Sequence, residues 1–155
     1  MGRDCGYLAL MSGIAGGAEA VVIPECETTP EEVADIIHTS YERGKAHALV
    51  VVAEGAPYNA DKLMHYFKER KAELGFDVRV TTLGHVQRGG APGAYDRLLA
   101  TRLAAGAVDQ LEKGETGVLM GTIKGAITPT PLEDVICRTK SVDLNLLKLL
   151  KSLSR

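Results

Sequence analysis

The sequence predicts an α/β protein, arranged as a three-layer α/β/α sandwich around a mostly parallel sheet. Helix-like and strand-like stretches alternate along the whole chain, which is typical of parallel sheets covered by helices. The first two strand candidates, residues 20–23 and 48–53, are short and apolar, as expected of strands buried on both faces. With 155 residues, 45% hydrophobic and 25% charged, the chain has the size and composition of one globular domain, or of one domain and part of another.

Capping signals mark the helices that should flank these strands. Thr29 precedes Pro30 and Glu32, which combines an N-cap, a proline in the first turn and a glutamate that can close a capping box. Asn59 is a similar N-cap for the next helix, and Gly75 lies past that helix's end. We expect the helices of this half at about residues 8–14, 30–43 and 60–74.

The rest of the chain continues the alternation. Residues 76–83 alternate between apolar and polar side chains and predict a strand that ends at Gly84. Further along, we expect a long helix at 95–111, a strand at 117–121, a returning hairpin arm at 123–127, a capped helix start at 130–133 and an amphipathic terminal helix from 143.

Composition argues against several functional classes. The formal net charge of -2 argues against a nucleic-acid surface, and the chain contains neither a long apolar run nor a signal-like leader, so we expect a cytoplasmic protein. Cys5, Cys26 and Cys137 are odd in number and far apart, which indicates reduced thiols. The histidines show no metal-site spacing, so no metal site built from this chain alone is expected.

The most informative stretch is residues 82–92, which follows the predicted strand at 76–83. His85 and Arg88 fall on a tight loop at that strand's carboxyl end, where open α/β sheets bind ligands. Arg88 offers a forked guanidinium, and Gly89 and Gly90 let backbone N–H groups approach a phosphate. The alternative is an ordinary strand-to-helix turn with a solvated arginine, and the spacing alone leaves both interpretations open.

Two more charged residues occupy positions where ligands bind. Arg3 lies just before the first predicted helix, whose free N–H groups favour an anion, although a frayed terminal arginine is an equal alternative. Glu54 directly follows a predicted buried strand, so Glu54 and His85 could face one pocket if their strands are neighbours. Otherwise Glu54 is a hydrated turn residue.

A basic cluster precedes the strand at 48–53. Arg43, Lys45 and His47 place three cationic groups within five residues, and such groups often only complement a helix dipole. Glu19 lies in a similar loop position, where it could pair with this cluster or hold a metal–phosphate ligand.

Five separated motifs agree in identity, order and spacing with one known family. They are MGRxCGYLAL at 1–10, GGAE at 16–19, IPE at 23–25, VAEG at 52–55 and RVTxLGHVQRGGxPxxYDR at 79–97. Together they resemble the carboxyl-terminal half of the 6-phosphofructokinase family, which transfers a phosphoryl group from ATP or pyrophosphate, with Mg²⁺, to the 1-hydroxyl of fructose 6-phosphate. The tail beyond Gly121 is the least diagnostic part.

The resemblance implies a substrate site and an effector site. The implied substrate-binding residues are Met1, Gly2, Arg3, Glu54, Arg79, His85, Val86, Gln87 and Arg88. Among these, Arg3 is the implied catalytic residue, and Arg79 is expected to reach the 6-phosphate across a subunit interface. The implied effector site, for a nucleotide diphosphate or phosphoenolpyruvate, comprises Gly17, Ala18, Glu19, Arg43, Lys45, Ala46 and His47.

The resemblance also divides the chain and shows what the sequence lacks. It implies a sugar-phosphate-binding domain at 1–88, a segment at 89–140 that returns to the family's nucleotide-binding domain, and a terminal helix at 141–155. The GGD-type and TIDND-type motifs that supply the family's nucleotide cradle, Mg²⁺ carboxylate and base do not occur in this sequence. We therefore expect a piece of a longer protein, inactive alone, with an exposed apolar surface or self-association around residues 95–121.

Two functions are compatible with these observations. The first is the sugar-phosphate-binding and effector-binding half of a glycolytic, allosteric 6-phosphofructokinase that forms homo-oligomers with sites shared between subunits. The second is a non-catalytic sugar-phosphate or effector-binding module that self-associates or partners a kinase.

Overall fold

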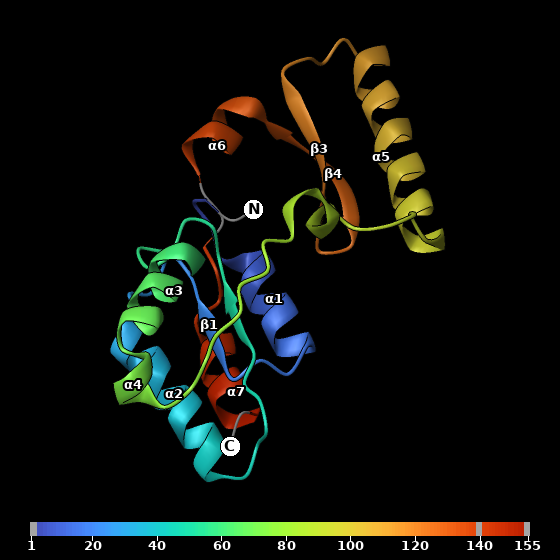
Figure 1. Ribbon diagram of the computed structural model, residues 1–155. Coiled ribbons are helices and arrows are strands. Elements are labelled where there is room, and N and C mark those ends of the chain that lie inside the picture. The colour runs from blue at the N-terminus through green and yellow to red at the C-terminus, as the bar shows by residue number, and fades with distance from the viewer. Residues whose placement is uncertain (1–2, 139–140, 154–155) are drawn as a thin grey trace. The chain divides into compact units, whose positions relative to one another are not determined.

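The computed structural model describes residues 3–138 and 141–153, except for the side chains of Arg88 and Lys151. The chain forms two compact units (Figure 1), residues 1–87 with 141–155 (unit 1) and residues 88–140 (unit 2). Both units mix helices and strands, and unit 1 contains a parallel strand pair, so the predicted α/β class is confirmed.

The parallel pair of unit 1 is the centre of its fold. Strand β1 (Ala20–Val22) runs parallel to β2 (Val50–Val52), with Val21 opposite Val51 in the register. Both strands lie where the sequence predicts them, although each is shorter than expected.

Helices cover both faces of this strand pair. Val21 and Ile23 belong to one buried cluster, which also contains residues of α1 (Tyr7–Ala15) and α7 (Asn145–Leu153). Val22 points into the other cluster, with residues of α2 (Pro30–Glu42) and α3 (Ala60–Glu69). Neighbouring strand residues therefore face opposite helix layers, which gives the predicted α/β/α arrangement (Figure 1).

The predicted caps form as expected. The Thr29 hydroxyl accepts a hydrogen bond from the Glu32 N–H at 3.2 Å, and the Glu32 carboxylate accepts one from the Thr29 N–H at 2.9 Å. The Asn59 side chain accepts a hydrogen bond from the Lys62 N–H at 3.1 Å. A short helix, α4 (Lys71–Leu74), follows α3 and ends at Gly75, whose φ is 73°.

The predicted strand at 76–83 is wrong. These residues carry no ladder bonds, and β2 pairs with β1 alone among the described strands. The alternation of burial holds over residues 76–79 only, because Phe76 and Val78 pack against the core while Asp77 and Arg79 are exposed. An alternating pattern indicates which face is buried, but a strand also requires a backbone partner. The predicted tight loop contains a 3-10 helix, η1 (Gly84–Arg88).

Unit 2 packs a long helix on a hairpin. The hairpin consists of the antiparallel strands β3 (Val118–Ile123) and β4 (Ala126–Pro131). Helix α5 (Ala94–Glu112) approaches it closely at Gly106, where an added Cβ would lie 2.9 Å from the Ile127 side chain.

The capped helix start predicted at 130–133 is displaced. Helix α6 (Leu132–Cys137) has Pro131 at its N-cap without a side-chain cap, and Thr130 lies in β4. Strand pairing holds Thr130 in an extended conformation, which overrides its local preference for a cap.

Unit 2 has an exposed apolar surface, as predicted. None of residues 89–138 is fully buried, and Leu98 and Leu111 are 60% and 65% exposed. The described helices of the whole chain include none with the length and apolar character that crossing a bilayer requires.

Candidate functional site

The carboxyl ends of β1 and β2 lie at one edge of unit 1. The strands are parallel and in register, and the Ala53 N–H continues their pairing by donating to the Val22 carbonyl at 2.8 Å. Glu54 directly follows this pair, and Glu25 lies in the turn after β1. This edge therefore gathers carboxylates where parallel sheets bind ligands.

Arg3 reaches this edge through a close backbone contact. A Cβ added at Gly55 would lie 2.7 Å from the Arg3 Cα and closer still to its carbonyl group. A glycine is therefore required for the approach. Because Gly55 follows Glu54, the contact places Arg3 beside the Glu54 turn, and both residues are exposed. The structure thus brings together two of the predicted substrate-binding residues.

The same segment is held at a second point, which sequence reasoning missed. Both carboxylate oxygens of Glu25 accept a hydrogen bond from the Gly6 N–H, at 2.9 and 3.0 Å. The amino end of α1 thus carries an anion supplied by the protein itself. The available signal was that Glu25 follows the first buried strand much as Glu54 follows the second.

The predicted phosphate loop lies on η1. His85 and Val86 are exposed there, and the Gln87 side-chain amide donates to the Gly84 carbonyl at 2.8 Å. Gly84 and Gly89 adopt φ angles of 58° and 102°, which favour glycine.

Some of the predicted substrate residues fall outside what the structure describes. Met1, Gly2 and the side chain of Arg88 are not among the described residues. Arg3, Glu54 and His85 do not line either of the pockets presented below. A pocket shared by Glu54 and His85 stays a prediction.

The amino ends of the same strands carry the predicted effector residues. Glu19 precedes β1, and Lys45 lies ahead of β2. The Lys45 ammonium donates to one Glu19 oxygen at 3.0 Å, and the Leu49 N–H donates to the other at 2.6 Å. Of the two roles expected for Glu19, the structure shows the pairing with the basic cluster.

Glu19 is held in its ionised form. Burial by itself would raise the pKa of its carboxyl group. The hydrogen bonds from the Leu49 N–H and Lys45, together with the charge of Lys45, outweigh burial, so the pKa of Glu19 lies below its usual value of 4.5.

The other predicted effector residues lie around this pair. Gly17 takes a φ of 67° in the turn after α1, and the adjacent Ala18 is buried. Arg43 is the C-cap residue of α2, and Ala46 and His47 are exposed in the connection to β2.

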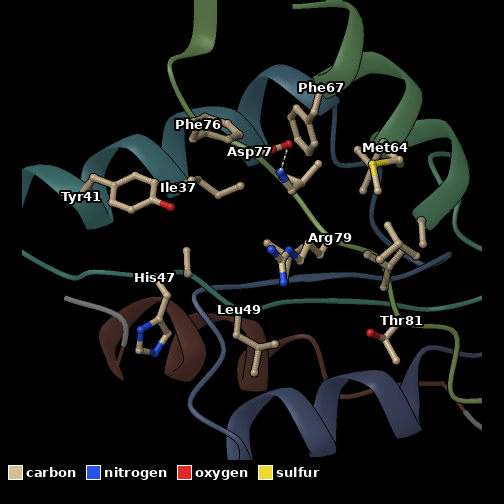
Figure 2. A pocket seen from close by; sticks show the side chains of 17 residues that line it. Ile37, Tyr41, His47, Leu49, Met64, Phe67, Phe76, Asp77, Arg79 and Thr81 are labelled. Atoms are coloured by element: carbon tan, nitrogen blue, oxygen red, sulfur yellow. Dashed lines mark hydrogen bonds between the residues drawn. The ribbon is translucent and has the colours of Figure 1, made fainter. Parts of the chain in front are cut away.

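A pocket of about 460 Å³ lies beside β2 (Figure 2). Its walls are mainly apolar side chains of α2, α3 and β2, and the extended segment 76–81 lines it with Arg79. Figure 2 shows Arg79 extending into the space between that segment and Leu49. His47 lines the same pocket, so the structure places one predicted substrate residue and one predicted effector residue together.

A second pocket, of about 470 Å³, contains two predicted effector residues. Glu19 and Arg43 line it, together with Glu27, Glu32 and Asp35. Among the described residues, no group of three or more histidine, cysteine or acidic side chains could hold a metal ion.

Open α/β sheets bind ligands at the carboxyl ends of their strands, which is where this chain brings Arg3 and Glu54 together. A family model described as phosphofructokinase matches residues 1–111 of this sequence. The chain therefore belongs to the phosphofructokinase family.

Curated relatives and solved structures agree with this assignment. The chain is 47% identical over 154 residues to an ATP-dependent 6-phosphofructokinase of Natranaerobius thermophilus, covering 99% of this chain and 47% of that protein. It is 45% identical over 150 residues to ATP-dependent 6-phosphofructokinase 1 of Thermus thermophilus, covering 96% of this chain and 46% of that protein. The chain thus spans about half the length of these curated relatives.

The fold matches a solved structure from a yeast. The crystal structure of Pichia pastoris phosphofructokinase in the T-state superposes with a TM-score of 0.75 at 34% identity, covering 99% of this chain and 18% of that one. The predicted family and fold are therefore confirmed.

Proposed function

We propose that this chain is the fructose 6-phosphate-binding half of a 6-phosphofructokinase, which phosphorylates fructose 6-phosphate to fructose 1,6-bisphosphate in glycolysis. The observation that carries the proposal is the contact between the Arg3 backbone and Gly55, which brings Arg3 to Glu54 at the carboxyl edge of the parallel pair. A guanidinium and a carboxylate at this edge suit a ligand that combines a phosphoryl group with hydroxyl groups.

Each substrate residue has a role that fits its chemistry. The Glu54 carboxylate accepts hydrogen bonds from sugar hydroxyls, and Arg3 compensates negative charge on the transferring phosphoryl group. His85 and Arg88 hold the 6-phosphate from η1, where Val86 and Gln87 complete the contact. Arg79 reaches the 6-phosphate bound by a neighbouring subunit of a cytoplasmic homo-oligomer. Met1 and Gly2 contact the sugar.

The phosphoryl donor is assigned to residues beyond this chain. The relatives named above are ATP-dependent, which supports ATP over pyrophosphate as the donor. Within the part of the chain that the structure describes, no cluster of three or more histidine, cysteine or acidic side chains is placed to hold a metal ion by itself. The part of this chain is therefore to bind and orient the sugar phosphate, while ATP and Mg²⁺ are held mostly elsewhere.

The amino edge is proposed as an allosteric site for a nucleotide diphosphate or phosphoenolpyruvate. Arg43, Lys45 and His47 supply cationic groups for its phosphates, and Gly17, Ala18 and Ala46 let the ligand approach the backbone. Glu19 keeps Lys45 in place at 3.0 Å until a ligand competes for it.

Titration calorimetry with fructose 6-phosphate tests the substrate proposal on this chain alone. We expect binding without turnover in a coupled assay, and weaker binding by the Glu54→Ala variant. Glu27→Ala, which removes an exposed carboxylate elsewhere, is the matched control. Absence of fructose 6-phosphate binding would contradict the proposal, and turnover by the chain alone would contradict the assignment of the donor site.

Complementation separates this proposal from a stand-alone binding module. The amino-terminal half of the Natranaerobius thermophilus relative would be produced together with this chain. Restored phosphorylation of fructose 6-phosphate is the expected result. Sugar-phosphate binding with self-association, but without restored turnover, would favour the module.

A further inference from the structure

We propose that Glu25 is a positioning residue for Arg3, because its carboxylate fixes the segment that carries Arg3 onto the edge of the sheet. This inference rests on the proposed function and deepens it. Glu25 itself is not placed in contact with substrate, so its effect on catalysis acts through the Arg3 segment.

The segment between Arg3 and Gly6 is held at both ends. At one end, the Arg3 backbone packs against Gly55 so closely that a Cβ there would overlap it. At the other end, the Gly6 N–H donates to both carboxylate oxygens of Glu25 at 2.9 and 3.0 Å. Only residues 4 and 5 separate the two contacts. The backbone from which the Arg3 side chain extends therefore has little freedom.

Each contact attaches residues 3–6 to the turn that follows a different strand. Glu25 lies in the turn after β1, which is closed by a bridge between Ile23 and Cys26. Gly55 lies in the turn after β2. Since β1 and β2 are paired in register, the two contacts together set the position of Arg3 relative to the Glu54 turn.

The Gly6 contact is built for an acidic side chain. Gly6 is buried, and a Cβ there would lie 2.8 Å from a Glu25 oxygen and closer still to Ile23. A charged acceptor strengthens a backbone hydrogen bond, and the amino end of α1 adds a favourable dipole. Loss of the carboxylate releases an N–H group that the described helix does not use.

The expected functional effect falls on turnover more than on substrate affinity. The proposed contacts of Met1 and Gly2 lie on the Arg3 segment, but those of Glu54, His85 and Arg88 come from other segments, so substrate still binds when the Arg3 segment shifts. A catalytic group displaced by about 1 Å can lower the rate about a hundredfold. We therefore expect Glu25→Ala to lower kcat about ten- to hundredfold in the complete enzyme, with a much smaller change in KM for fructose 6-phosphate.

Amide hydrogen exchange tests the anchor separately from the function. In this chain, Glu25→Ala should accelerate exchange of the Gly6 N–H about tenfold or more, because a hydrogen bond to a charged group is lost. The Ala53 N–H, which bonds the Val22 carbonyl, is the internal reference and should not change. Glu25→Gln keeps an acceptor oxygen and should restore both slow exchange and most of kcat.

A control and a replacement variant complete the design. Glu69→Ala removes an exposed carboxylate that lines neither pocket and should leave Gly6 exchange and kcat unchanged. Should Glu25→Ala not fold, Glu25→Asp replaces it, because the shorter side chain keeps the charge but not the reach.

The possible outcomes distinguish the Glu25 anchor, its positioning role and the proposed function from one another. Unchanged Gly6 exchange in both Glu25→Ala and Glu25→Asp would overturn the anchor. Faster exchange with unchanged kcat, in an enzyme that loses turnover when Arg3 is replaced, would overturn the positioning role and leave the proposed function intact. A complete enzyme that does not phosphorylate fructose 6-phosphate would overturn both. Faster exchange with lower kcat, both restored by glutamine, supports the inference.

Discussion

The two ends of the β1–β2 pair both carry acidic and basic side chains, but they hold these side chains in different ways. At the amino end, Glu19 is buried and its charge is already matched by Lys45 at 3.0 Å. At the carboxyl end, Arg3 and Glu54 are exposed and are brought together by backbone contacts. A ligand at the amino end therefore meets an existing ion pair, whereas a ligand at the carboxyl end meets a framework that backbone packing has already positioned.

This difference is compatible with the proposed regulatory site at the amino end and the proposed substrate site at the carboxyl end. Separating an ion pair that has a buried member costs free energy, because removal of one member leaves a buried charge without compensation. Only a ligand that offers Lys45 a strong anion, and Glu19 a new partner, would separate the Lys45–Glu19 ion pair.

The largest expected effect is on fructose 6-phosphate, the ligand proposed for the carboxyl end. A guanidinium–phosphate contact contributes about 1.5–3 kcal/mol, so Arg88→Ala should weaken fructose 6-phosphate binding roughly tenfold or more. Calorimetry on the complete enzyme measures this change, and Lys113→Ala, at the exposed C-cap of α5, is the control. An unchanged dissociation constant would remove Arg88 from the site.

The backbone framework at that end can be broken directly. Gly55→Ala would force a Cβ into the Arg3 backbone, so we expect the free energy of unfolding to fall by about 1–3 kcal/mol. Chemical denaturation measures the change. Gly121→Ala, where an added Cβ meets nothing within 4 Å, should be nearly neutral. Equal effects of the two substitutions would show that the approach of Arg3 is not tight.

The amino end should respond in regulation alone. Lys45→Ala removes the cation that a phosphate would bind, so the response of the complete enzyme to an effector should fall about tenfold, while turnover without effector stays within about twofold. Kinetics with and without a nucleotide diphosphate make the measurement. Equal loss of both properties would contradict the separation of the two ends.

The smallest expected effect is the pH dependence of the Glu19 contact. Because the folded-state pKa of Glu19 lies below 4.5, its contribution to stability is present above that pH and is lost as pH falls through the folded-state pKa. Denaturation of wild type and Glu19→Gln at neutral and acidic pH should show a smaller loss in the variant. Identical pH profiles would refute this prediction.

Local chemistry made much of unit 1 predictable. The Thr29 capping box and the Asn59 cap form because all their atoms come from within four residues of sequence. Pairing of Glu19 with the basic cluster was one of two roles expected from their similar loop positions, and the structure shows it with Lys45. Where the chemistry is local, or follows from strand order, sequence reasoning was sufficient.

Contacts between distant residues could not be predicted in the same way. Gly6 and Glu25 are 19 positions apart, and no periodic pattern relates a backbone N–H to a remote carboxylate. The contact between Arg3 and Gly55 depends on how tightly two segments pack. A glycine permits such close packing, but its presence in the sequence does not indicate which residue packs against it. The strand prediction at 76–83 was wrong for a related reason. Alternation of apolar and polar residues indicates which side chains are buried, but it does not show that a neighbouring strand is available for pairing.

The exposed apolar surface of unit 2 also has a consequence for the cell. Leu98, Leu111 and Ile136 are 60%, 65% and 82% exposed in a unit whose residues 89–138 include none fully buried. Chaperones and proteases act on chains that present uncovered apolar side chains. The abundance of this polypeptide is therefore expected to depend on how promptly that surface is shielded after synthesis.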